Sequence, residues 1–292
     1  MPTALVLCRL LHFAATMQLF GANVFVWALV PAGLARELTG PMRRMTAAAI
    51  VVAAITAFAW LALESGQMGE GWGDVLNPAA LGAVSFETAF GRVWLWRLAI
   101  ALALVVALAM GGRERLAFLV PASALLLASL GLVGHATLQA GLIGALHRLN
   151  HGVHLLAAGA WLGGLLPLIL CLRRDGDVRL RAEVGAALRR FSGLGHFAVA
   201  LVVLTGVVNN ALTLGAWPID FSSPYQALLA AKIAVVAVMI AMALFNRYVL
   251  TPRIKSEPGF VLRALTVNSF VEIALGMAVL ALVSAFALLE PI

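Results

Sequence analysis

The chain has 292 residues, of which 63% are hydrophobic and only 11% are charged, and its formal net charge is +7. Soluble domains carry about 25% charged residues, and the mean hydropathy here is +1.01. This composition excludes an ordinary soluble protein and predicts an all-α, polytopic membrane protein embedded in a lipid bilayer.

Long runs with few charges divide the chain into membrane spans. About 20 apolar residues are needed to cross the hydrocarbon core as a helix. In the third and seventh predicted helices, Arg92, Arg97 and Lys232 would have to extend along the helix to the interface. We predict eight transmembrane helices, near residues 5–34, 45–63, 92–111, 116–138, 147–172, 191–214, 226–250 and 264–289.

The basic residues indicate the orientation. Fifteen of the 20 lie in the loops and helix ends after the first, third, fifth and seventh helices. Cytoplasmic loops are enriched in Lys and Arg, so we expect those loops inside the cell and both termini on the outer side of the membrane. The positive charge is then a topology signal and needs no nucleic-acid partner.

The two halves of the chain share a weak internal sequence repeat, which we call the echo. His12 and His154 are each followed by Ala after three residues and by Gly after nine. Phe90 and Tyr225 each precede a cation, Arg97 and Lys232, by seven residues. We therefore predict a single transmembrane domain over 1–292 built from two parallel four-helix repeats, 1–140 and 141–292. His12 and His154 would be equivalent, and the first and fifth helices would meet at the centre.

Histidines gather toward the outer ends of the predicted helices. Spaced at i, i+4 and i+7, His147, His151 and His154 share one helix face. Imidazole suits copper and zinc, and thiolate or thioether favours Cu(I). We expect copper, as Cu(I) or Cu(II), between the first and fifth helices. Its expected ligands are the following: His12, His151 and His154, with His147 and His135 at the entrance and Cys8 and Met17 nearby. The alternative is that the outer histidines are interfacial, that His154 bonds backbone, and that Cys8 and Met17 are packing residues.

A second polar group lies near the inner ends of the helices and comprises His196, Asn246, Arg247 and Glu272. An unpaired acidic residue at mid-bilayer costs about 3 kcal/mol, so we expect Glu272 to pair with Arg247 or His196. Two roles stay open for this group. It forms a buried ion pair that fixes helix packing, or it belongs to an exit or proton-coupling pathway.

Other functions are weighed against copper transport. The sequence holds no phosphate loop, no Ser/His/Asp set and no paired carboxylates, so we expect no enzyme. A b-type haem electron carrier would use His12 with His154, or His135 with His151, as axial ligands from two helices. A third hypothesis is a component that binds copper at the outer site and delivers it without transport.

Four stretches together resemble the CopD/PcoD copper-resistance family. They are HGVHLLAAGAWLGGLLPL, TAFGRVWLWR, YQALLAAKIAVVAVMIAMALFNRYVLTPR and RALTVNSFVEIALGMAVLAL. The resemblance implies an eight-helix protein of the bacterial inner membrane that carries copper from the periplasm to the cytoplasm. It also implies a separate periplasmic copper-binding partner of the CopC type.

Overall fold

The structure, a computed structural model, describes residues 1–134, 139–215 and 217–291. All regular elements in these ranges are helical, which confirms the all-α prediction. In chain order, with π and 3-10 turns labelled η, they are α1 (Pro2–Val24), η1 (Phe25–Leu29), α2 (Ala32–Met68), η2 (Trp72–Asp74), α3 (Pro78–Glu87), α4 (Ala89–Val106), η3 (Ala107–Ala109), α5 (Gly112–Ala128), η4 (Ser129–Leu132), α6 (Gly141–Leu172), α7 (Arg181–Leu214), α8 (Pro224–Phe245), η6 (Asn246–Leu250), η7 (Thr251–Lys255) and α9 (Pro258–Phe286).

Eight of the described helices are long and apolar enough to cross a membrane, as predicted. Their ends differ from the prediction. The first span ends at Leu29 because Val30 is extended before Pro31, as residues before proline usually are. Residues 35–44, expected as a loop, form the first turns of α2. A helix can continue past the hydrocarbon core, so its end need not coincide with the first charge.

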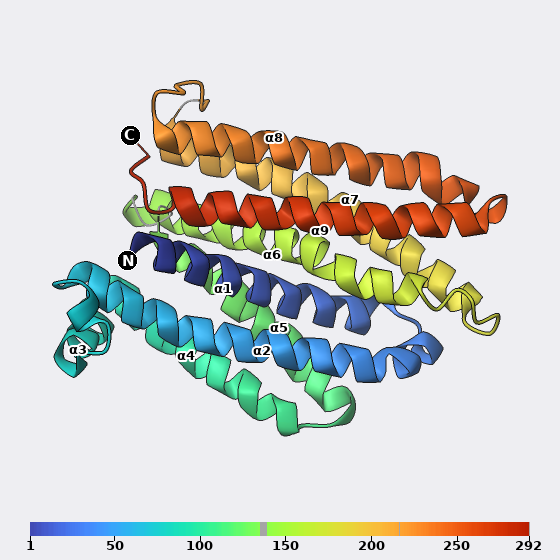
Figure 1. The fold of residues 1–292 in the computed structure, drawn as a ribbon, viewed down its shortest axis with the longest axis horizontal. Coiled ribbons are helices and arrows are strands. Elements are labelled where there is room, and N and C mark those ends of the chain that lie inside the picture. The colour runs from blue at the N-terminus through green and yellow to red at the C-terminus, as the bar shows by residue number, and fades with distance from the viewer. Residues whose placement is uncertain (135–138, 216, 292) are drawn as a thin grey trace.

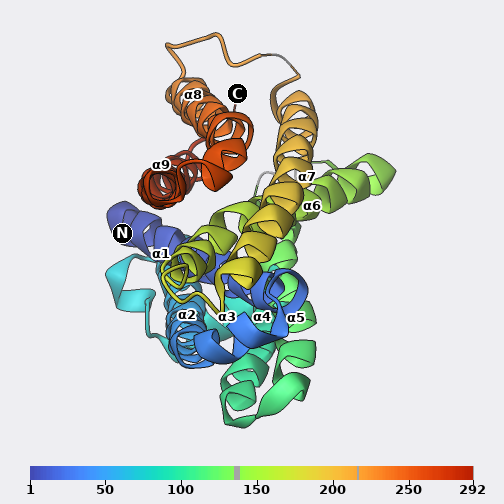
Figure 2. The same ribbon diagram turned by 90° about the vertical axis from the view of Figure 1, so that its right-hand side faces the viewer.

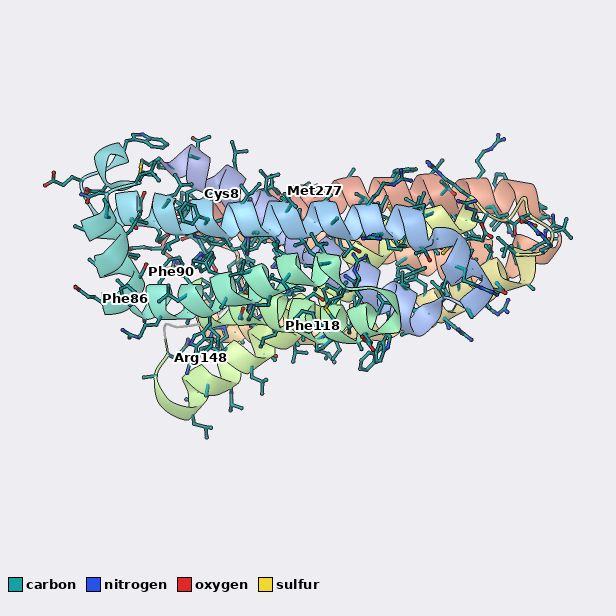
Figure 3. The ribbon with its side chains drawn as sticks, turned by 90° about the horizontal axis from the view of Figure 1, so that it is seen from below. Cys8, Phe86, Phe90, Phe118, Arg148 and Met277 are labelled. Atoms are coloured by element: carbon teal, nitrogen blue, oxygen red, sulfur yellow. The ribbon has the colours of Figure 1, made fainter. Side chains whose placement is uncertain are left out.

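Both chain termini lie at one end of the bundle, beside α3 (Figure 1). We call this the terminal end; Cys8, Phe90 and Arg148 all lie toward it (Figure 3). The opposite end, here called the basic end, holds the α6–α7 and α8–α9 connections. The short helix α3 lies in a segment expected to be a loop, and the side chain of Asn77 caps it by accepting from Ala79 N at 3.0 Å.

The two helices that carry the echoed histidines, α1 and α6, pack together at the centre, as predicted (Figures 1 and 2). Glycine permits this approach: a Cβ on Gly21 would lie 2.3 Å from the Gly159 carbonyl oxygen and 2.6 Å from Gly163 Cα. Gln18 Nε2 donates to the Gly163 carbonyl oxygen at 3.1 Å. The α6 glycines Gly159 and Gly163 thus allow close packing of the two helices.

Each half of the protein contributes four long helices, α1, α2, α4 and α5 in one and α6 to α9 in the other. The two halves differ in how their second and third long helices pack. In the N-terminal half, α2 packs along α4. In the C-terminal half, α8 packs chiefly on α9 and makes few direct contacts with α7 (Figure 2). The C-terminal half is therefore the more open of the two.

Candidate functional site

His12 is fully buried in the N-terminal half and both of its ring nitrogens are bonded. Nδ1 lies 2.9 Å from Thr56 Oγ1, and Nε2 lies 2.6 Å from Nη2 of Arg97. Because the Thr56 hydroxyl donates to the Val52 carbonyl, it accepts from His12 Nδ1–H. Arginine carries only donors, so the Nε2 lone pair accepts from Arg97. We call His12, Thr56 and Arg97 the N-terminal cluster.

The expected extension of Arg97 to the interface is wrong. Its side chain has no exposed surface. Nη1 donates to the Leu126 carbonyl at 2.7 Å and to Ser129 Oγ at 2.6 Å, and the guanidinium lies 4.7 Å from the centre of the Trp94 ring. The protein interior supplies acceptors and an aromatic face, so Arg97 does not have to reach water.

An equivalent arrangement surrounds His154 in the C-terminal half. Its Nδ1 lies 2.9 Å from Thr205 Oγ1, and this hydroxyl donates to the Leu201 carbonyl. His154 therefore also donates from Nδ1, which leaves the lone pair on Nε2. Lys232 stands on α8 at the position that Arg97 has on α4, and its ammonium lies 5.9 Å from the centre of the Phe286 ring. We call His154, Thr205 and Lys232 the C-terminal cluster.

The two clusters share their order along the chain: histidine on the first helix of each half, threonine on the second and a cation on the next long helix. The cation lies nine residues after a hydroxyl N-cap in both cases, Thr88 for α4 and Ser223 for α8. They differ at Nε2. Arg97 covers the lone pair of His12, whereas no hydrogen bond to His154 Nε2 is present among the described residues.

Two more histidines lie on α6 toward the terminal end. His147 is buried, and its Nδ1 lies 2.7 Å from Gln139 Oε1. The rings of His151 and His154 are nearly parallel, with centroids 6.2 Å apart, and His151 Nδ1 lies 3.2 Å from Asn209 Nδ2. This part of α6 thus presents three oriented imidazoles.

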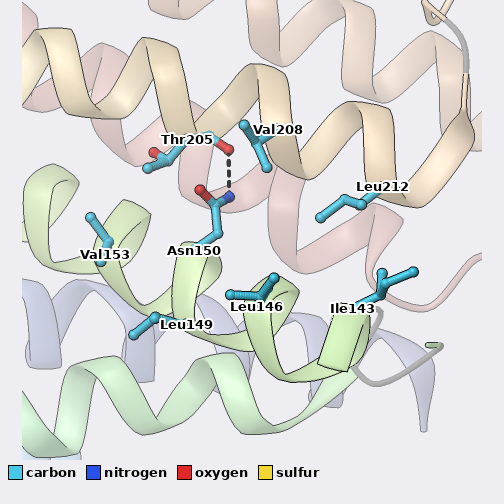
Figure 4. Close-up of a pocket in the computed structure, with 8 residues that line it drawn as sticks. All are labelled: Ile143, Leu146, Leu149, Asn150, Val153, Thr205, Val208 and Leu212. Atoms are coloured by element: carbon cyan, nitrogen blue, oxygen red, sulfur yellow. Dashed lines mark hydrogen bonds between the residues drawn. The ribbon is translucent and has the colours of Figure 1, made fainter. Parts of the chain in front are cut away.

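An apolar groove of about 580 Å³ runs between α6 and α7 beside these histidines (Figure 4). Asn150 is its polar centre, donating to the Thr205 carbonyl and to Asn209 Oδ1, both at 2.9 Å. Asn150 and Asn209 therefore connect the His151 region of α6 to α7, whose Thr205 contacts His154.

The structure does not bring the predicted ligands together in one site. In the part of the chain it describes, no group of three or more His, Cys, Asp or Glu residues is placed to hold a metal ion. His12 faces α2 and α4, and His154 faces α7. The haem hypothesis pairs the same two histidines as axial ligands, and in this structure they face different helices. His135, expected at the entrance and in the second haem pair, lies outside the described residues.

The two sulfur side chains have packing partners. Cys8 Sγ donates to the Thr56 carbonyl at 3.3 Å, next to the N-terminal cluster. Met17 is buried in the apolar core where α1 crosses α6. Both are buried and contribute to the contacts that hold α1 in place.

The inner group gathers around Glu272, but the predicted ion pair is wrong. Glu272 Oε1 accepts from Asn246 Nδ2 at 2.8 Å and Oε2 from Trp161 Nε1 at 3.2 Å. Arg247 donates instead to Ser192 Oγ at 2.9 Å, and His196 Nε2 lies 3.0 Å from the Tyr248 hydroxyl. The cause is the π-helical turn η6, in which Asn246 is directed to α9 while Arg247 is directed to α7.

These features define the class of protein. It is a polytopic helical membrane protein with two buried polar clusters, oriented histidines toward one end of the bundle and a buried carboxylate toward the other. Comparison with known proteins assigns the family. Residues 1–145 match the model of the copper resistance protein D-like N-terminal domain, and residues 185–286 match that of copper resistance protein D. The chain belongs to the copper resistance protein D family, as the sequence resemblance implied.

Named relatives agree over nearly the full length. The chain is 38% identical over 285 residues to inner membrane protein YebZ of Escherichia coli (strain K12), covering 97% of both chains. It is 26% identical to copper resistance protein D of Pseudomonas syringae pv. tomato, covering 97% of this chain and 95% of the relative. It is 24% identical to copper transport protein CutJ of Bacillus subtilis (strain 168), covering 92% of this chain and 50% of CutJ. No solved structure matches the chain.

Proposed function

We propose that this protein carries copper across the bacterial inner membrane, from the periplasm to the cytoplasm, and that the copper passes through the C-terminal half. His154 is the central ligand of the proposal, with His151 beside it and His147 toward the entrance. The names of the relatives, copper resistance protein D and copper transport protein CutJ, support copper as the transported ion.

The observation that carries this proposal is the difference between the two Nε2 atoms. Thr205 fixes His154 in the tautomer that leaves a lone pair on Nε2, which is how a hydrogen-bonding partner prepares a histidine to bind metal. His12 has the same tautomer, but a copper ion at its Nε2 would have to displace the Arg97 guanidinium. We therefore leave His12, Cys8 and Met17 outside the copper path.

The proposed copper path runs along α6. Trp161 follows His154 by seven residues, about 10 Å along the helix. It packs with Ala198 of α7 and Met239 of α8 in a small apolar cluster, which separates the outer histidines from the polar group at Glu272. Rearrangement of this apolar cluster would connect the two sides.

In the orientation we propose, the terminal end lies in the periplasm, so the outer histidines face the side from which copper would enter. The arginines of the α6–α7 connection, Arg173 and Arg174, would then be cytoplasmic. A membrane-impermeant thiol reagent added to spheroplasts should label Gly73→Cys, beside α3, and leave Gly176→Cys unlabelled. Native Cys8 and Cys171 are buried, so their background should be low; the reverse labelling pattern would contradict the orientation. A periplasmic partner of the CopC type would deliver copper at the terminal end.

We also propose that the two halves are repeats. The shared order of histidine, threonine and cation, and the equal spacing from N-cap to cation, support a duplication. In this view the N-terminal cluster has become a structural site, and the C-terminal cluster has kept a metal-binding histidine.

Metal analysis and an absorption spectrum of the same purified sample test the proposal. The wild type should bind copper, and His154→Gln should bind much less. A strong Soret band that disappears in His154→Gln would assign this histidine to haem and overturn its role as a copper ligand.

A further inference from the structure

A cavity of about 260 Å³ opens between α6, α7, α8 and α9 toward the basic end. Its walls are apolar apart from a short list of polar side chains: Ser192, His196, Asn246, Arg247, Thr251, Ser269 and Glu272. His196 and Arg247 are partly exposed, whereas Glu272 is only 2% exposed. The cavity thus leads from partly exposed polar groups to a buried carboxylate.

Glu272 has no cationic partner. Among the described residues no Lys, Arg or His lies within ion-pair distance of it, and its hydrogen bonds come from two neutral donors, Asn246 and Trp161. A buried ionised carboxylate is unfavourable unless it is paired. Such a group in a membrane therefore takes up a proton or a cation.

The charged groups around Glu272 do not neutralise its carboxylate, so the carboxylate can still take up a proton or a cation. On α7 and η6, His196 and Arg247 are bonded to Tyr248 and Ser192. On α6, the facing group is the neutral indole of Trp161. On α9 itself the nearest charge is the exposed Arg263. On α1, which packs on α9, the titratable groups Cys8, Arg9 and His12 all lie in the N-terminal half of the helix, which begins at the terminal end.

Asn246 is held as a donor toward the carboxylate. Asn268 Nδ2 donates to Asn246 Oδ1 at 2.6 Å, which fixes the amide with its Nδ2 toward Glu272. The π-helical geometry of η6 supplies this orientation, and such turns are frequent at functional sites. The arrangement keeps Glu272 in a fixed position at the end of the cavity.

We propose that Glu272 is a proton-binding site served by the cavity, and that its protonation is coupled to copper movement. The coupling passes through Trp161. The indole N–H bonds more strongly to a carboxylate than to a neutral carboxyl group, so protonation loosens Trp161 from α9. Trp161 is also part of the apolar cluster on the copper path, and its release favours passage of the ion. This coupling rests on the proposed copper transport; the proton site does not.

Infrared spectroscopy of the purified protein across a pH series tests the proton site directly. A C=O stretching band of a protonated, buried carboxyl group should appear as the pH falls, disappear in Glu272→Gln and shift in Trp161→Phe. Glu64→Gln, which alters the carboxylate 3.8 Å from Arg9, is the matched control and should keep the band. A band that survives in Glu272→Gln, or no band at any pH at which the protein stays folded, overturns the proposal.

Copper uptake into proteoliposomes tests the coupling separately. With a pH gradient imposed across the membrane, uptake by the wild type should change with the sign of the gradient, and Glu272→Gln should remove that dependence. Uptake that ignores the gradient in both proteins overturns the coupling. A protein that carries no copper at all refutes the proposed function, while the infrared result still decides the proton site.

Discussion

Nη2 of Arg97 and Nε2 of His12 lie 2.6 Å apart in the interior of the N-terminal half, where neither side chain has exposed surface. A permanently charged guanidinium is thus held by a neutral imidazole, a carbonyl and a hydroxyl, and no carboxylate among the described residues pairs with it. The contact joins α1 to α4 at a depth where water cannot replace a lost acceptor.

Removing His12 should therefore destabilise the fold. In His12→Ala, Nη2 of Arg97 loses its acceptor, and a buried charged donor without a partner costs about 3 kcal/mol. We expect a clearly lower Tm in detergent. His154→Ala is the control: it removes a bond to Thr205, whose hydroxyl keeps its carbonyl acceptor, so its Tm should fall by less. Equal losses in the two variants would contradict the structural role of the N-terminal cluster.

The contact between α1 and α6 should not tolerate a methyl group at Gly21. Its Cβ would meet backbone atoms of Gly159 and Gly163, which cannot move unless the helices separate. We expect Gly21→Ala to lower the free energy of unfolding by about 1–3 kcal/mol, measured by thermal or denaturant unfolding in detergent.

Gly193 provides the matched control for this substitution. It lies within α7 and has nothing within 4 Å of its Cβ position. Gly193→Ala should be neutral or stabilising by about 0.5–1 kcal/mol, because alanine is the better helix former. A stable Gly21→Ala protein would show that the two helices are not packed as closely as described.

The equivalent threonines should behave differently in copper binding. Thr205→Val removes the acceptor that orients His154, and loss of such a partner typically weakens metal affinity by roughly 10- to 100-fold. Thr56→Val makes the same change beside His12 and should leave copper affinity unchanged. A copper titration of the two purified variants measures both. A loss in Thr56→Val and none in Thr205→Val would place the metal in the N-terminal half.

The sequence was sufficient for the fold and for the central helix contact. Hydropathy located eight spans, and the His-to-Gly echo predicted that α1 and α6 meet. The helix ends were less predictable, because charged residues such as Arg36 are compatible with helix outside the hydrocarbon core. The short helix α3 also escaped prediction, since its segment carries no clear periodic pattern.

The partners of the buried charges could not be predicted from the sequence. Hydropathy treats Arg97 as a residue that must reach water, and its actual acceptors lie on α1, α5 and η4, placed by tertiary packing. Arg247 and His196 were the nearest charges to Glu272 in depth, but the π-helical turn directs Asn246 to α9 instead. The one sequence feature that set Arg97 apart from other basic residues was its equivalence to Lys232 in the internal echo.

Copper uptake into proteoliposomes by the pair His154→Gln and His12→Gln tests the central claim most directly. Glutamine at position 12 keeps an oxygen acceptor for Arg97, so both variants can be compared as folded proteins. We expect His154→Gln to lose uptake by roughly tenfold or more and His12→Gln to keep most of it. Undiminished uptake in His154→Gln, or a loss confined to His12→Gln, would contradict a copper path through the C-terminal half.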